Sequence, residues 1–121
     1  MVKITIYGQP ITKKNSQMII MAGKRPCIIQ SKAYRQYEKN AKEQMAFLSS
    51  LPTIEGPVQM TCLYYLATAR DPDLLNLLAA TSDLMEYVGV VLNDKQIKSV
   101  DGSRIMGKDP EPRVEITLEE F

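Results

Sequence analysis

The stretch VQMTCLYYLATARDPDLLNLLAATSDLMEYV, residues 58–88, decides the fold expected for this chain, because it joins a strand pattern directly to a helix pattern. Apolar residues alternate through residues 58–66, and the intervening positions are partly apolar as well. A strand that is apolar on both faces is typical of the centre of a sheet. From residue 74 apolar residues recur at three- and four-residue intervals, which predicts a helix over 74–88 that Gly89 ends.

Two carboxylates lie between this strand and this helix. Asp71 and Asp73 flank Pro72 at the end of the predicted central strand, a common location for binding sites in sheets covered by helices. A third carboxylate, Asp94, follows the helix in Leu92-Asn93-Asp94-Lys95. The three form the acidic constellation of this sequence that is suited to a divalent metal. The alternative for Asp73 is a plain helix N-cap, and Asp-x-Asp pairs are also common in turns.

The chemistry open to these carboxylates is limited by the absence of histidine from the sequence. Without histidine the usual triads, zinc sites and commonest general base are excluded. Magnesium prefers carboxylate oxygens and accepts a phosphate oxygen as a further ligand. A metal so placed lowers the pKa of bound water and offsets charge that develops on a phosphodiester.

Positive charge is concentrated in the first part of the chain. Residues 1–54 hold nine of the 15 Lys and Arg residues but two of the 14 acids, so this part is basic and the remainder is acidic. A basic portion suits a polyanion, whereas simple attraction between the two parts of the fold is the alternative. Two apolar runs, 18–22 and 26–29, flank Gly23-Lys24-Arg25 and predict a hairpin with a basic tip.

The remaining patterns complete an α/β (α+β) fold, a mixed sheet with an N-terminal strand, a hairpin and two main helices. Strands are expected over 2–7, 97–100 and 114–119, and a loop or a distorted edge hairpin over 102–112. Ser31 is a candidate N-cap for an amphipathic helix through Leu48, in which Tyr34 faces the core and the outer face is basic. We expect one domain over residues 1–121.

Two further expectations concern the cysteines and the cellular location of the protein. Cys27 and Cys62 lie in apolar runs without CxxC spacing, which predicts buried free thiols. No apolar run approaches the roughly 20 residues that span a bilayer, so we expect no membrane segment and a cytoplasmic protein.

Leu75 and Tyr87 lie off the main apolar stripe of the helix over 74–88. That helix is therefore expected to bury more than one face, and a homodimer contact is one way to do so.

Four segments in order carry a family resemblance: Pro10-Ile11-Thr12-Lys13-Lys14-Asn15, Ser31-Lys32-Ala33-Tyr34-Arg35, Asp71-Pro72-Asp73 and Leu92-Asn93-Asp94-Lys95-Gln96-Ile97. Together they resemble the RusA-type Holliday junction resolvases over nearly the whole chain. The resemblance implies a homodimeric endonuclease that makes paired nicks in four-way junction DNA, in a bacterial or phage-infected cell. It implies Mg²⁺, with Mn²⁺ as a substitute, held by Asp71, Asp73 and Asp94. The implied DNA-binding residues are Lys13, Lys14, Asn15, Lys24, Arg25, Arg35 and Arg70.

The sequence departs from this family at the start of the second helix. The family pattern D-x-D-N-L-x-K is interrupted here by Leu74-Leu75, and with Asn76 as the family asparagine the catalytic lysine position is Ala79. Because no lysine occurs between Arg70 and Lys95, we expect one of these two cations to substitute. The alternatives are a junction-binding or assembly protein with weak or no cleavage, and a small ligand-binding or protein-interaction domain.

Overall fold

The structure is a computed structural model that describes residues 1–12, 17–23, 25–30, 32–46, 53–69 and 72–121. Several of the sequence predictions fall outside these ranges. They are the assignments of Lys13, Lys14, Asn15, Lys24, Ser31, Arg70 and Asp71, and the extension of the first helix to Leu48.

A mixed five-stranded sheet forms the body of the molecule. It contains β1 (Val2–Tyr7), β4 (Val58–Leu66), β5 (Ile97–Ser99), β6 (Arg104–Lys108) and β7 (Arg113–Glu120), in the order β1-β7-β4-β5 with β6 also paired to β4. The pairs β1/β7 and β7/β4 are antiparallel, whereas β5 and β6 both run parallel to β4. The strand predicted to be central, β4, therefore has neighbours on both edges.

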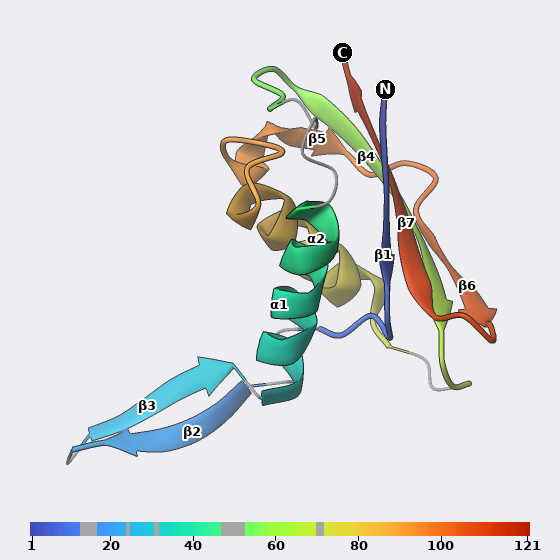
Figure 1. Cartoon of the computed structure of the whole chain (residues 1–121). Helices are drawn as coiled ribbons and strands as arrows, with labels where there is room; N and C mark the ends of the chain where they lie inside the picture. Colours follow the sequence, from blue (N-terminus) through green and yellow to red (C-terminus); the bar gives the residue numbers. More distant parts are fainter. Residues whose placement is uncertain (13–16, 24, 31, 47–52, 70–71) are drawn as a thin grey trace.

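Two helices, α1 (Lys32–Ala46) and α2 (Leu74–Tyr87), cover one face of the sheet (Figure 1). The core lies between them and the sheet, because every second residue of β4 is buried and the apolar stripe of α2 points at this face. The predicted stripe is confirmed, and Gly89 at φ +83° follows the C-cap residue Val88. The buried residues of this apolar stripe are Leu77, Leu78, Thr81, Leu84 and Met85.

One edge of the sheet differs from the prediction. Residues 104–108 form a strand parallel to β4, where the sequence indicated a loop or a distorted edge hairpin. The Ser103 hydroxyl accepts from the Cys62 N–H at 3.0 Å, and the Thr61 hydroxyl donates to the Asp101 carbonyl at 3.0 Å. These side-chain bonds continue the edge of β4 across the gap between β5 and β6. The alternation in β6 is only between half-buried and exposed residues, so it gives little strand signal.

The predicted hairpin is confirmed as a separate two-stranded sheet of β2 (Gln17–Ala22) and β3 (Arg25–Gln30). Gly23, at φ +68°, supplies the left-handed residue that its turn requires. Figure 1 shows this hairpin extending away from the sheet and the helices.

Buried side chains also agree with the sequence. Tyr34 is 2% exposed, as expected for a core residue. Cys62 is a buried free cysteine, and burial raises the pKa of its thiol to about 12. No helix among the described residues is long and apolar enough to cross a membrane.

Candidate metal centre

Asp73 is the N-cap of α2 and is exposed to solvent. Its Oδ1 accepts from the backbone N–H groups of Leu75, at 2.8 Å, and Asn76, at 3.4 Å. Both bonds end on the same oxygen, so Oδ2 makes no hydrogen bond with the described part of the chain. The two functions considered for Asp73 are therefore compatible: one oxygen caps the helix and the other is available to a cation.

Asp94 begins the short 3-10 helix η1 (Asp94–Gln96), whose position is fixed by several side chains. The Asp94 backbone N–H donates to Oε1 of Glu86 at 2.9 Å, and Asn93 caps the helix by accepting from the Lys95 N–H at 2.8 Å. The Gln96 amide donates to the carbonyls of two residues before β4, Ile54 and Gly56. The half-buried Asp94 makes no carboxylate hydrogen bond or ion pair with the residues that the structure describes.

The structure does not bring Asp73 and Asp94 together within one chain. Asp73 precedes the first turn of α2, while Asp94 is bonded to Glu86 in its last turn. A helix of 14 residues is about 20 Å long at 1.5 Å per residue. Magnesium holds each of its oxygen ligands at roughly 2.1 Å. The described carboxylates of a single chain therefore do not fit one ion.

The same conclusion holds for the other described acidic side chains. Among the described residues, no group of three His, Cys, Asp or Glu side chains lies close enough to hold a metal. Asp71, the third ligand predicted from the sequence, lies outside those residues, as does Arg70. The two described ligands of the candidate centre, Asp73 and Asp94, therefore lie at opposite ends of α2.

Lys95 and Ala79 are the two described positions that bear on whether a cation lies near Asp73 or Asp94. Lys95 is exposed and follows Asp94 directly, so within one chain it lies far from Asp73. Ala79, the position predicted for the family lysine, is exposed on α2 and supplies no charge. Ala79 shares the outward-facing side of α2 with Leu75 and Glu86, which are both exposed, and with the half-buried Ser82.

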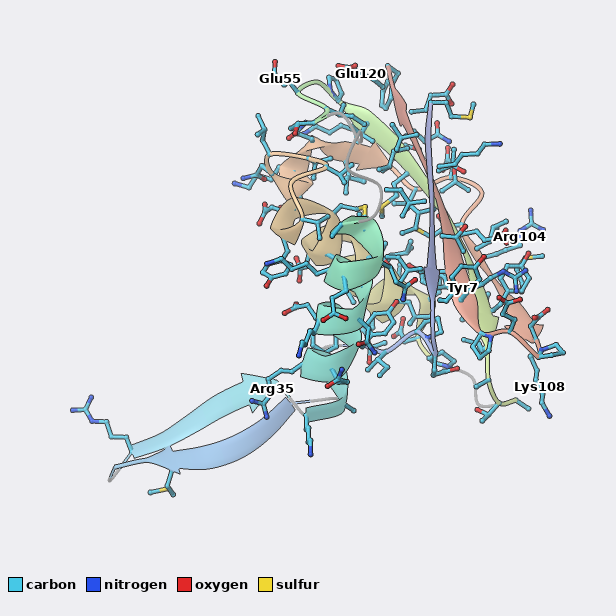
Figure 2. All side chains as sticks on the ribbon, in the orientation of Figure 1. Tyr7, Arg35, Glu55, Arg104, Lys108 and Glu120 are labelled. Carbon is cyan, nitrogen blue, oxygen red and sulfur yellow. The ribbon has the colours of Figure 1, made fainter. Side chains whose placement is uncertain are left out.

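The basic surface predicted for the first half is confirmed where it is described. Arg25 is exposed at the hairpin turn, and Figure 2 shows Arg35 where the hairpin meets the first turn of α1. Lys42 lies over Tyr87 of α2, with its ammonium nitrogen 4.9 Å from the ring centroid. The exposed basic residues of α1 are Lys32, Arg35, Lys39 and Lys42.

Three positioning residues were missed by sequence reasoning. Glu86 holds the Asp94 backbone, and its contact spans eight residues without any local pattern. Gln9 accepts from the Ala67 N–H and so ties the segment after β4 to the segment after β1. Gln96 forms a capping box with Asn93, and this one had a signal, because Asn-x-x-Gln before a strand fits the capping-box spacing.

One comparison with known proteins identifies a relationship. A family model described as endodeoxyribonuclease RusA matches residues 7–119, from the end of β1 to the end of β7. No curated protein matches the chain. The family match includes both ends of α2 and the basic first half, and it confirms the resemblance predicted from the sequence.

Proposed function

Because this chain belongs to the RusA endodeoxyribonuclease family, we propose that it resolves four-way DNA junctions as a homodimer, by paired phosphodiester hydrolysis. Nucleases of this family are metal-dependent, and membership implies a Holliday junction substrate. The observation that carries the proposal is the extent of the family match, which covers residues 7–119.

In this proposal Asp71, Asp73 and Asp94 hold Mg²⁺, for which Mn²⁺ can substitute. Because Asp73 and Asp94 of one chain lie at opposite ends of α2, the ligands of one ion are contributed by both chains of the homodimer. The ion, when bound, lowers the pKa of the attacking water and offsets charge on the cleaved phosphate. The assignment is supported by the Oδ2 of Asp73 and the carboxylate of Asp94, neither of which bonds to a residue that the structure describes. Lys95 is proposed to stabilise the developing negative charge, since Ala79 cannot.

Two of the proposed DNA-binding residues are described by the structure: Arg25 on the hairpin and Arg35 on α1. Both support a basic DNA-binding surface, because Arg25 is exposed at the hairpin turn and Arg35 is exposed where the hairpin meets α1 (Figure 2). Neutralising phosphates releases counterions, so affinity is expected to fall steeply with salt. The residues assigned from the sequence alone are Lys13, Lys14, Asn15, Lys24 and Arg70.

A second candidate is a junction-binding or assembly protein that cleaves weakly or not at all. The observation that favours it is the exposed Ala79 on α2, where the family pattern has a lysine. Loss of one group that stabilises a transition state costs about 10²–10³ in rate. The two candidates therefore differ in cleavage, while both predict junction binding.

A nicking assay on labelled synthetic four-way junctions separates them. We expect the purified wild type to cut with Mg²⁺, to bind without cutting in chelator, and to lose cleavage in Asp71→Asn. Lys98→Ala is a matched control, because Lys98 is exposed on β5 and has no assigned role. Junction binding without cleavage in Mg²⁺ and in Mn²⁺ would instead establish the second candidate.

A further inference from the structure

The side-chain amide of Gln9 joins the two segments that leave β1 and β4. Its Oε1 accepts from the Ala67 N–H at 2.5 Å, and its Nε2 donates to the Pro10 carbonyl at 3.3 Å. Resting on the proposed function, we infer that Gln9 is a positioning residue for DNA cleavage. It holds the segment after β1, which leads to Lys13, in register with the segment after β4, which leads to Asp71.

The order of the strands gives this contact its importance. β7 lies between β1 and β4 and is antiparallel to both, so β1 and β4 run in the same direction and end at the same edge of the sheet (Figure 1). The two strands are not paired with each other. The Gln9 side chain therefore links strands that the backbone ladder does not join directly.

The end of β4 is held firmly up to the residue that Gln9 binds. The Arg113 guanidinium lies over the Tyr65 ring, 3.8 Å from its centroid, and the Leu66 carbonyl accepts from the Asp109 N–H at 2.9 Å. Leu66 is buried, whereas Ala67 is exposed. Gln9 extends the support by one residue beyond the strand, into the exposed segment between β4 and α2.

The segment after β1 also begins at fixed positions. The Gly8 N–H donates to the Pro112 carbonyl at 2.9 Å, just before β7 begins, and Pro10 is buried. Thr12 is buried as well and precedes Lys13 directly. Gln9 lies within this fixed start, so its bond to the segment after β4 gives both segments one common anchor.

A common anchor is useful because both segments act on the same DNA in the proposed function. Phosphates bound after β1 and the carboxylate that follows β4 need a constant spacing, and an error of about 1 Å in such positioning can cost about 100-fold in rate. Gln9 itself contacts neither DNA nor metal in this arrangement. Its loss should therefore lower the cleavage rate and leave the phosphate contacts, and with them the junction affinity, unchanged.

Gln9→Met keeps the length of the side chain and removes both hydrogen bonds. With saturating junction and Mg²⁺ we expect its cleavage rate to fall about 10- to 100-fold, while junction affinity stays within about twofold of wild type. Gln59→Met is the matched control, because Gln59 is half-buried on β4 and makes no side-chain hydrogen bond with the described residues. Equal cleavage rates in the two variants, or a loss confined to affinity, would overturn the inference.

Gln9→Glu tests whether the bond to Ala67 is responsible. Its carboxylate can still accept from the Ala67 N–H, which the thioether of Gln9→Met cannot do at comparable strength. We expect its cleavage rate at saturating junction to lie within a few-fold of wild type. A rate as low as that of Gln9→Met would contradict the assigned hydrogen bond.

Hydrogen exchange at the Ala67 amide tests the anchor without any cleavage. In the free protein, exchange should be about 10-fold faster in Gln9→Met than in the wild type or Gln59→Met, because the acceptor is lost. Junction binding, in buffer without Mg²⁺, should slow this exchange further in the wild type but not in Gln9→Met. Exchange that is equal in Gln9→Met and the wild type would overturn the inference even if the protein cuts DNA. The expected exchange in a wild type that cannot cut would instead contradict the proposed function and leave the anchor in place.

Discussion

Glu86 fixes the backbone of Asp94: its carboxylate accepts the Asp94 N–H at 2.9 Å, from the last turn of α2. Loss of a group that orients a metal ligand typically costs 10- to 100-fold in affinity or activity. We therefore expect Glu86→Ala to lower junction cleavage about 10-fold and to raise the Mg²⁺ concentration for half-maximal rate. Metal titrations of the cleavage rate measure both effects.

Glu86→Gln separates the hydrogen bond from the charge. Its amide oxygen can still accept from Asp94, so this variant should stay within a few-fold of wild type. Glu119→Ala, at an exposed acid near the end of β7, is the control for a lost surface charge. Equal losses in Glu86→Ala and Glu119→Ala would show that Glu86 does not position Asp94.

Asp73 combines a helix cap with a proposed metal ligand, and two substitutions separate these functions. Asn is as good an N-cap as Asp, so Asp73→Asn should unfold at nearly the wild-type urea concentration and yet lose cleavage. Asp73→Ala should lose cleavage and also about 1 kcal/mol of folding free energy. Full cleavage by Asp73→Asn would show that Asp73 serves only as a helix cap and not as a metal ligand.

The buried hydroxyl pair under α2 predicts unequal costs for its two members. The Thr81 hydroxyl donates to the Leu77 carbonyl at 2.9 Å, so the Tyr64 hydroxyl is the donor in its 2.7 Å contact with Thr81. Tyr64→Phe removes that donor and should cost about 1 kcal/mol, while Thr81→Val strands the Tyr64 hydroxyl and should cost about 2 kcal/mol. Urea unfolding measures both, and the reverse order would reject the assigned donor.

Burial of Cys62 predicts a fall in stability at alkaline pH. Its thiol pKa is raised from 9.0 to about 12, chiefly by desolvation, so below pH 9 the thiol is protonated in both the folded and unfolded states. Above that pH the unfolded state loses its proton first, and stability should fall by up to about 1.4 kcal/mol per pH unit.

The buried tyrosines limit the window in which this effect is measured. Burial also raises the pKa values of Tyr34, Tyr37 and Tyr64 above their ordinary 10, so their contributions begin near pH 9 and grow above it. Urea unfolding between pH 8 and 9.5 should therefore show a steeper fall in stability with pH in the wild type than in Cys62→Ala. A slope unchanged by this substitution would mean that the Cys62 thiol is not responsible.

Arg35, in the first turn of α1, is expected to contact a DNA phosphate. Removing one phosphate contact reduces the slope of log affinity against log salt by about 1. Arg35→Ala should show this smaller slope in junction-binding titrations, with the same proportional loss on different junction sequences. Lys98→Ala is the control. If Arg35→Ala and this control have the same slope of log affinity against log salt, Arg35 does not contact a DNA phosphate.

The sequence predicted most of the fold because its patterns are local. Alternation identified β1, β4 and β7, three- and four-residue spacing identified α2, and Gly23 between apolar runs identified the hairpin. The edge strand β6 was missed because its side chains are only half-buried at best, so no apolar alternation marks it. Its partner is β4, far away in the sequence.

The candidate centre was less accessible to sequence reasoning. The spacing of Asp71, Asp73 and Asp94 identified residue types that bind metal, but it contains no information on the direction of the helix between them. Asp73 and Asp94 proved to lie at opposite ends of α2, and Glu86 reaches Asp94 through a tertiary contact. Such distances depend on helix length and packing, which no motif records.

Paired cleavage of a junction is the property that most clearly identifies a resolvase, and a supercoiled plasmid that extrudes a cruciform measures it in one reaction. Two nicks placed within one binding event linearise the plasmid, whereas independent nicks give open circles first. We predict that the wild type with Mg²⁺ yields linear plasmid directly and that chelator leaves it supercoiled. Plasmid that stays supercoiled in Mg²⁺ and in Mn²⁺, while the protein is bound to the cruciform, would contradict the assignment.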